Sequence, residues 1–399
     1  MTSSIASKSR AKFRRGATAA LLLSLACGTL VACDRAPSPS AASTKKTTLG
    51  FAVSSWNTAI YESRFMDECP GGINATNDEY WWRGLSKEQR GKQTENGMIT
   101  QIMRQAIANH RGPNGEDVCQ VPTAVNDPPL ITVEGKISYG MNLDGTTDGR
   151  ESPKTCKHEK FTGVDGTPAV DNQLYRLLGC VYGWRSIGHI ETAANGSRRT
   201  NGLGMILVEV TDVDDPRNDD DVKVTFYRSV DQFTFDRSDN PLPYSTFRID
   251  YDNGNPRYGD TVKGKITNGV LTTEPADVSL PFYGNYAFQT MRLRDVRLNL
   301  KIADDAAAAE GLLAAYYTTE QLWEYVGELG WQPTGVYNCP SIYQAMLKLA
   351  DGYRDDKGEC QAISSAFKVK AIAAFIRHDH EPAAGPVLAG NTTKTTAGP

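Results

Sequence analysis

The sequence predicts a mainly β protein with helical additions (α+β), whose core is an antiparallel β-sandwich or a jelly-roll-like fold. From Pro129 onward, short segments carry apolar residues at every second position, as half-buried strands do. Gly, Asp, Asn and Pro separate these segments at a spacing typical of antiparallel sandwiches and barrels. Segments with helical periodicity lie before and after this region.

The chain begins with the features of a secretory signal peptide. Five basic residues lie between Lys8 and Arg15, and a short apolar run follows from Ala17 to Ala26. This run is too short to span a bilayer comfortably. We therefore expect export from the cytoplasm and removal of the leader, residues 1–32.

The leader ends in Leu30-Val31-Ala32-Cys33. This segment resembles the lipobox of bacterial lipoproteins, in which small residues precede a cysteine that is lipidated and becomes the mature N-terminus. The resemblance covers only this segment. It implies that Cys33 is the lipid (palmitate) attachment site and that the protein is membrane-anchored in the bacterial cell envelope, in the periplasm or at the cell surface. The alternative is an ordinary cleaved signal followed by a chance cysteine.

The remaining chain divides by composition and periodicity. Residues 33–48 are rich in Ser, Ala, Pro and Thr and predict a flexible tether. The expected segments after it are an N-terminal helical segment (49–128), a β-sandwich core (129–304), C-terminal helices with a returning strand (305–379), and a disordered tail (380–399).

The N-terminal segment begins with an extended stretch, Phe51 to Tyr61, and then becomes helical. Ser86 starts a capping box, and apolar residues from Ile99 to Ile107 share one helix face. Ahead of this helix lies Tyr80-Trp81-Trp82, which either packs the helix on a sheet or, if exposed, stacks on sugars.

The core strands are expected at 130–134, 135–141, 204–211, 222–229, 246–252, 261–266, 270–273 and 292–302. In the last of them the apolar phase slips once around Asp295, which predicts a β-bulge. A capping box at Thr318 predicts a helix, and Ile342 to Leu349 predicts a second one. Alternation from Phe367 to Ala371 predicts the strand that returns to the sheet.

Charge argues against nucleic acid as a partner. The whole chain has a formal net charge of −4, and removal of the five basic leader residues takes it to about −9. The hydrophobic content is sufficient for a sizeable core in one large domain or two smaller ones.

Six cysteines remain after the leader and Cys33, and an even number in an exported protein predicts three disulfides. They are Cys69, Cys119, Cys156, Cys180, Cys339 and Cys360. Sequence proximity favours pairing each with its neighbour, which gives Cys69–Cys119, Cys156–Cys180 and Cys339–Cys360.

Acidic loops are the one chemical signal above background. Asp144, Asp148, Asp165 and Asp171 lie in two turn-rich segments after a strand, and the first of these imitates half of an EF-hand loop, although Thr155 stands where its bidentate Glu belongs. The connection 212–221 carries six carboxylates, among them those of Asp212, Asp214, Asp219 and Asp221. Clustered carboxylates suit calcium, so we predict structural calcium binding at one or both of these loops; a solvated acidic loop is the alternative.

Catalytic motifs are absent: the sequence has no GxSxG, P-loop, HExxH or GxGxxG pattern, and His158 has no triad context. The expected function is therefore a non-catalytic binding or structural role in the envelope, with a glycan or another envelope protein as the candidate partner. The alternative is a secreted, glycosidase-like hydrolase that uses scattered carboxylates.

Overall fold

The computed structural model describes residues 46–74, 86–88, 90–91, 111–126, 129–186, 188, 190–284, 287–331 and 339–378. The leader, Cys33, the tether, the Tyr80-Trp81-Trp82 segment, the helix predicted around Ile99 to Ile107 and the C-terminal tail lie outside the described residues.

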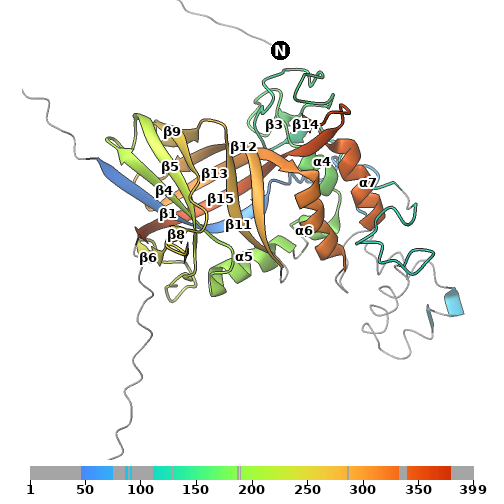
Figure 1. The fold of residues 1–399 in the computed structure, drawn as a ribbon, viewed down its shortest axis with the longest axis horizontal. Helices are drawn as coiled ribbons and strands as arrows, with labels where there is room; N and C mark the ends of the chain where they lie inside the picture. Colours follow the sequence, from blue (N-terminus) through green and yellow to red (C-terminus); the bar gives the residue numbers. More distant parts are fainter. Residues whose placement is uncertain are drawn as a thin grey trace, which may run out of the picture. The chain divides into compact units, whose positions relative to one another are not determined.

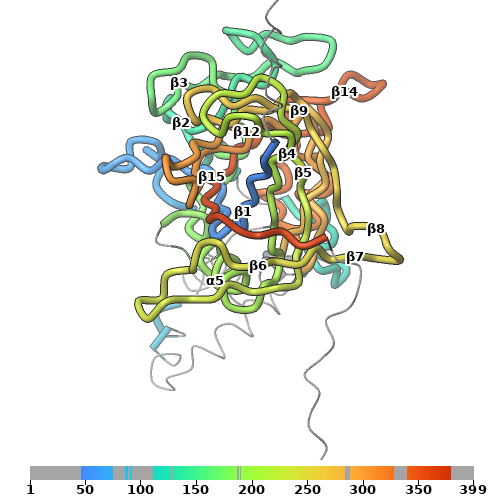
Figure 2. The backbone as a smooth tube through the Cα atoms, turned by 90° about the vertical axis from the view of Figure 1, so that its left-hand side faces the viewer, coloured from blue at the N-terminus to red at the C-terminus, as the bar shows by residue number. Residues whose placement is uncertain are grey.

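Eight antiparallel strands close into a barrel (Figures 1 and 2). In hydrogen-bonding order they are β1 (Thr47–Thr58), β4 (Met205–Val213), β5 (Asp219–Ser229), β9 (Thr261–Thr267), β10 (Val270–Thr273), β12 (Ala287–Ile302), β13 (Ala308–Thr318) and β15 (Cys360–Arg377). The long strand β15 pairs with β13 on one side and with β1 on the other, which closes the circle.

The mainly β class is confirmed, but the sandwich or jelly-roll arrangement is wrong. The reason lies in two strands that the pattern did not assign to the sheet. Strand β1 hydrogen-bonds to both β4 and β15, so it joins two edges that a sandwich would leave apart. Strand β13 is rich in Ala and Gly, and its short side chains give no clear alternation of polar and apolar residues.

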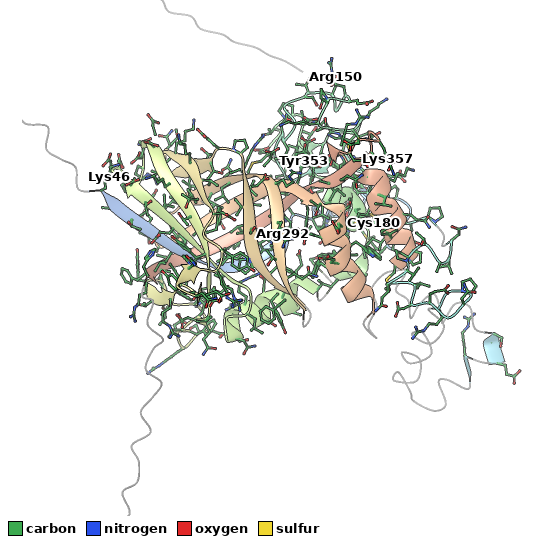
Figure 3. All side chains as sticks on the ribbon, viewed as in Figure 1. Lys46, Arg150, Cys180, Arg292, Tyr353 and Lys357 are labelled. Carbon is green, nitrogen blue, oxygen red and sulfur yellow. A yellow bond between two sulfur atoms is a disulfide. The ribbon has the colours of Figure 1, made fainter. Side chains whose placement is uncertain are left out.

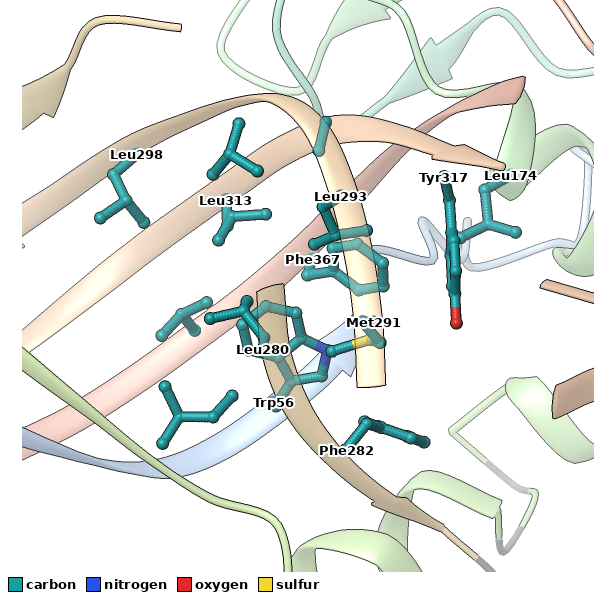
Figure 4. Close-up of a cluster of buried hydrophobic side chains, with 14 of the residues drawn as sticks. Trp56, Leu174, Leu280, Phe282, Met291, Leu293, Leu298, Leu313, Tyr317 and Phe367 are labelled. Atoms are coloured by element: carbon teal, nitrogen blue, oxygen red, sulfur yellow. The ribbon is translucent and has the colours of Figure 1, made fainter. Parts of the chain in front are cut away.

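The barrel interior is filled by one apolar cluster to which every barrel strand contributes. Strand β9 illustrates the alternation: Val262, Gly264 and Ile266 are buried, while Lys263 and Lys265 between them are exposed. Figure 4 shows part of this core, where Trp56, Leu280, Leu293 and Phe367 lie together.

The predicted bulge in β12 is confirmed. The register between β12 and β13 shifts between Arg294 and Arg297, and Asp295 adopts a positive φ of 51°. The extra residue moves the inward side chains from one parity, which includes Leu293, to the other, which includes Leu298, so both halves of the long strand face the core.

Further strands pair with the barrel strands or form two separate two-stranded sheets. They are β11 (Ala276–Gly284) on β12, β14 (Gly352–Arg354) and the parallel β6 (Ser245–Arg248) on β15, the pair β2 (Ile137–Ser138) and β3 (Thr162–Gly163), and the pair β7 (Tyr251–Asp252) and β8 (Asn255–Pro256). Residues 136–171, which we call the loop module, cover an outer patch of the barrel, where Leu143 packs against Tyr316 and Ala314.

Among the described residues, the helices with defined bounds are α4 (Gln173–Leu178), the 3-10 turn η1 (Tyr182–Trp184), α5 (Ile190–Asn201), α6 (Thr319–Trp331) and α7 (Cys339–Leu349). The two C-terminal helices were predicted, and they bury Leu322, Val326, Ile342 and Met346 as their periodicity requires. The sequence did not predict α4 and α5. Helix α4 begins at Asn172, whose side chain accepts a hydrogen bond from the amide of Tyr175. Helices α4, α6 and α7 contact one another or β15 (Figure 1).

All six cysteines form disulfides, as predicted, but the predicted connectivity is wrong. The bonds are Cys69–Cys180, Cys119–Cys339 and Cys156–Cys360, with sequence separations of 111, 220 and 204 residues. Proximity along the chain fails here because the closed sheet brings distant segments side by side. The Cys156–Cys360 bond ties the loop module to the start of β15.

Candidate functional site

The loop module is held against the barrel by backbone contacts as well as by its disulfide. The amide of Cys156 donates to the carbonyl oxygen of Asp351, and Thr155 forms a β-bridge with Gly352. From the barrel side, Arg297 donates to the carbonyl oxygens of Asn142 and Leu143 at 2.6 and 3.0 Å. Figure 3 shows Arg150 at the outer tip of the module and Tyr353 on the strand beneath it.

A buried charge cluster lies where the module meets the barrel. It consists of Asp144, His158, Lys160 and Asp171 from the module and Asp351 from the turn before β14. The Lys160 ammonium lies 2.5 Å from Asp144 Oδ1 and 2.6 Å from Asp171 Oδ1. The side chains of the three aspartates are at most 1 % exposed, so these ion pairs are shielded from water.

His158 is fixed by hydrogen bonds at both ring nitrogens. Nδ1 lies 2.8 Å from the carbonyl oxygen of Cys156, and Nε2 lies 2.8 Å from Asp171 Oδ1. Both partners are acceptors, which favours the doubly protonated ring. Burial alone would lower the pKa of His158, but the hydrogen bond to Asp171 and the charge of Asp351 raise it to about 9. The ring is therefore a cation at neutral pH and a poor general base.

The carboxylates of the cluster differ in their surroundings. Burial opposes ionisation of Asp171, yet hydrogen bonds from His158 and Lys160 hold its pKa below the usual range. Asp351 is more isolated: its Oδ1 accepts from the amide of Ser364, and its Oδ2 has no hydrogen-bond partner among the described residues. Burial raises the pKa of Asp351 to about 6, although the charge of His158 opposes this shift.

The charge cluster also contains the candidate metal-ligand group Asp144, His158 and Asp171. Ligand atoms of Asp144, His158 and Asp171 lie within 4.8 Å of one another, and no other group of this kind occurs in the part of the chain that the structure describes. However, the Lys160 ammonium already occupies the position between the two carboxylates that a cation would share. A protonated imidazole also offers no lone pair to a metal. The geometry fits a self-neutralising ion cluster better than it fits a calcium site.

The other acidic residues singled out by the sequence do not join this cluster. Asp148 is exposed and pairs with Arg150 at 2.9 Å, and Asp165 caps its own turn by accepting from the amide of Thr167. Of the four aspartates predicted in the two turn-rich segments, only Asp144 and Asp171 belong to the charge cluster.

Residues 212–221 comprise the end of β4, the turn at 214–218 and the start of β5. The carboxylate of Asp219 accepts hydrogen bonds from the amides of Asp214 and Asp221, and these bonds hold the backbone of the turn. Asp212 forms ion pairs with Lys223 at 2.9 Å and Lys46 at 3.8 Å. Backbone amides and lysines thus already engage these carboxylates, and calcium binding here stays a prediction.

A groove of about 560 Å³ lies beside the charge cluster, between the module, α4 and the end of α7. Its charged lining residues are Glu134, Lys136, Lys157, Glu159, Arg176 and Lys348, and His158 also borders it. We call it the basic groove because its lining combines four Lys or Arg residues with two Glu residues.

Sequence reasoning missed most of this site. His158 was noticed and set aside, and Lys160, Arg176 and Asp351 were not singled out. The strand-like spacing of His158 and Lys160 placed two cations on one side of an extended segment, which was a usable signal. No local sequence pattern singled out Asp351, which lies near His158 only because the fold brings the turn before β14 to the loop module.

Comparison with known proteins adds no family. No protein-family model, curated protein or solved structure matches this chain. Within the described ranges, no helix is both long and apolar enough to cross a membrane.

Proposed function

We propose that this is a lipid-anchored protein of the bacterial cell envelope that binds an acidic glycan in the basic groove without transforming it. The observation that carries the proposal is the state of Arg176, a nearly buried guanidinium that borders the groove and whose Nη2, itself shielded from solvent, has no hydrogen-bond acceptor among the described residues.

Arg176 is fixed on three sides. Nε donates to Gln173 Oε1 at 3.1 Å, Nη1 donates to the carbonyl oxygen of Val133 at 2.8 Å, and the guanidinium stacks 4.3 Å from the ring centre of Phe161. Nη2 has no hydrogen-bond acceptor among the described residues, and its nearest carboxylate, that of Glu159, is 3.7 Å away. An immobilised guanidinium loses little entropy when it binds a carboxylate, which favours recognition of an anion.

Two lysines extend the positive charge. Lys157 and Lys348 line the groove, and neither forms an ion pair with any residue the structure describes. Lys136 is paired instead with the exposed carboxylate of Glu159 at 2.6 Å. A ligand entering the groove therefore meets Lys157 and Lys348, which have no ion-pair partner among the described residues, beside Arg176, whose Nη2 lies 3.7 Å from the carboxylate of Glu159.

An acidic glycan matches the rest of the lining. Its carboxylates would pair with Arg176 and the lysines, and its hydroxyl groups would suit the oxygen atoms of Thr132, Glu134 and Glu159. The groove is open and polar, which suits a hydrated chain better than an apolar ligand.

The hydrolase alternative is less well supported by the same residues. A glycosidase needs one carboxylic acid whose pKa is raised so that it can donate a proton. In the groove, Lys136 lowers the pKa of Glu159 by hydrogen bonding and by its charge, which keeps this carboxylate ionised. We therefore assign the groove to binding.

The decisive experiment is calorimetric titration of the mature protein with oligogalacturonate and with a neutral oligosaccharide of equal length. We expect binding of the acidic oligosaccharide only, weakened at least tenfold by Arg176→Gln and unaffected by Arg257→Gln, which lies on the β7–β8 hairpin outside the groove. Equal binding of both sugars, or binding that Arg176→Gln leaves intact, would show the proposal to be wrong. Binding of anionic lipid vesicles in preference to the sugar would reassign the groove to the membrane, and release of shortened sugars would favour the hydrolase.

The anchor is tested separately. We expect the parent protein to fractionate with membranes and to incorporate labelled palmitate, and we expect Cys33→Ser to lose both properties. A Cys33→Ser variant that stays in the membrane fraction as firmly as the parent would contradict lipid anchoring.

A further inference from the structure

A second groove, of about 510 Å³, borders the charge cluster and shares no lining residue with the basic groove. We call it the tyrosine groove. Its walls are Leu143, Asp144 and residues 152–155 of the loop module, Pro275 before β11, Asp295 and Arg297 of β12, Tyr316 of β13, and Tyr353 of β14, which Figure 3 labels. Asp144 borders this groove and His158 borders the basic groove, and the two side chains are 3.7 Å apart. The charge cluster therefore lies between the two grooves.

Two cations that line the tyrosine groove are not neutralised by a carboxylate. Arg297 donates to the carbonyl oxygens of Asn142 and Leu143 at 2.6 and 3.0 Å, and its Nε, which is shielded from solvent, has no acceptor in the described part of the chain. Both partners are neutral, so they fix the guanidinium without balancing its charge. Lys154 also lines the groove, and neither cation forms an ion pair with a residue that the structure describes. A ligand carboxylate would supply the missing negative charge.

A carboxylate on the same groove has no cation as its partner. Asp295 lies at the bulge of β12 with a φ of 51°, and its amide donates to Asp277 Oδ1 at 3.1 Å. The neighbouring cation, Arg294, pairs with Asp277 at 3.6 Å and stacks 3.6 Å from the ring centre of Tyr353. Burial and a side-chain hydrogen bond to Asp295 raise the pKa of Tyr353. Asp295 therefore has a hydroxyl neighbour, but no ion-pair partner among the described residues.

Tyr316 adds a buried polar group without a partner. Its side chain borders the groove and the residue is 2 % exposed, yet its hydroxyl has no hydrogen-bond partner in the part of the chain that the structure describes. Buried polar groups almost always find a partner, so this hydroxyl indicates a ligand group. Burial and the negative charges of four aspartates raise the pKa of Tyr316; these are Asp351, Asp171, Asp144 and Asp295. Such surroundings favour an ammonium group, from which the hydroxyl oxygen can accept a hydrogen bond, over a second anion.

The remaining walls of the tyrosine groove are largely apolar. Leu143, Pro153 and Pro275 line it beside the two tyrosine rings, which meet edge to face with centres 5.5 Å apart. Apolar and aromatic walls around a few polar groups are typical of sites for small molecules. These walls suit an aliphatic or aromatic side chain better than a sugar with hydroxyl groups on every face.

We propose that the tyrosine groove binds a free amino acid with a large apolar side chain. The ligand carboxylate pairs with Arg297 and Lys154, its ammonium group pairs with Asp295 and the Tyr316 hydroxyl, and its side chain lies on the apolar walls. Asp295 and Arg297 stand two residues apart, roughly 6 to 7 Å along an extended strand, which suits a ligand whose two charges are close together. A simple carboxylate would leave Asp295 without a partner, and a simple amine would leave Arg297 without one.

The first test is calorimetric titration of the mature protein with the L and D forms of leucine and phenylalanine. We expect at least one of these four to bind. Its N-acetyl derivative, which lacks the ammonium charge, and its amide, which lacks the carboxylate, should each bind at least about tenfold more weakly. If none of the four binds at about 10 mM, or if either derivative binds as tightly as the free amino acid, the proposal is overturned.

Variants then locate the bound amino acid. Asp295→Asn and Tyr316→Phe should each weaken binding about fivefold or more, and both should fold, because Asn tolerates the positive φ and Phe keeps the ring. Tyr325→Phe is the matched control, since the Tyr325 hydroxyl is also buried without a partner among the described residues but does not line the groove. Binding that Asp295→Asn and Tyr316→Phe both leave intact would refute the site.

The two grooves are distinguished by one further variant. Arg176→Gln alters the basic groove and should leave amino-acid binding unchanged, whether or not it changes glycan binding. Loss of amino-acid binding in Arg176→Gln but not in Asp295→Asn would place the ligand in the basic groove and overturn the proposal. If one of the tyrosine-groove variants does not fold, the other variant and the two derivatives still decide the outcome.

Discussion

Removal of the Cys156–Cys360 disulfide, through the paired change Cys156→Ser and Cys360→Ser, should destabilise the protein by about 4 kcal/mol. The bond spans 204 residues, for which loop closure alone would give about 5 kcal/mol. The Cys119–Cys339 bond shortens the effective loop, because a path of about 58 residues runs from Cys156 to Cys119, across that bond, and from Cys339 to Cys360. Loop closure over that path corresponds to about 14 cal/mol/K, or about 4 kcal/mol at 25 °C.

The assay is equilibrium unfolding in urea, followed by tryptophan fluorescence, for the parent and the double variant at the same pH. The double variant avoids a single free thiol that could exchange with the remaining disulfides. Thiol titration of the unfolded parent without reductant should detect none of these six cysteines as free thiols. A loss below about 1 kcal/mol, or two free thiols in the parent, would refute the reasoning that this bond closes a long loop of the unfolded chain.

Four further predictions concern charged residues. The pKa of His158 in the folded protein is about 9, above the ordinary 6.5. The contribution of His158 to the free energy of unfolding is therefore complete below pH 6.5, and about 3 kcal/mol of it is lost as the pH rises through 9. In urea unfolding, His158→Gln should lack this dependence of stability on pH. Burial raises the pKa of Glu191 to about 7, so ionisation of this carboxyl group lowers the free energy of unfolding as the pH rises from about 4.5 through 7. Between pH 4.5 and pH 8, the stability of Glu191→Gln should therefore rise by up to about 3 kcal/mol relative to the parent. Equal dependence of stability on pH in both proteins would contradict this. Lys160→Ala should lower the free energy of unfolding by about 3 to 5 kcal/mol in chelator. Millimolar calcium should restore part of this loss, because the ion can then reach the carboxylates of Asp144 and Asp171. Any calcium-dependent shift in the melting temperature of the parent should disappear in Asp219→Asn.

Local patterns were sufficient for the elements whose side chains repeat on one face. Alternation identified β9, β10 and much of β12, and the slip of phase around Asp295 located a bulge that the strand pairing confirms. Helical spacing identified α6 and α7, because burial of Leu322 and Ile342 requires that period. These features depend on neighbours along the chain, so the sequence by itself determined them.

Closure of the sheet and the partners of the cysteines depended on contacts between distant residues. An inward and an outward face alternate in the same way in a sandwich and in a barrel, so the pattern of β1 could not reveal that it pairs with both β4 and β15. The same closure brings Cys360 to Cys156 across 204 residues. Sequence proximity was the wrong guide because the sheet, and not the loop length, decides which segments meet.

The charged residues could be identified in the sequence, but their burial and their interaction partners could not. Asp144 and Asp171 were selected as candidate calcium ligands, yet only the fold placed the Lys160 ammonium between them and brought Asp351 to His158. Arg198 gave no local sign that it would be fully buried, since a basic residue on an amphipathic helix is usually exposed. The electrostatic role of each group depends on its burial and its partners, and both are properties of the tertiary structure.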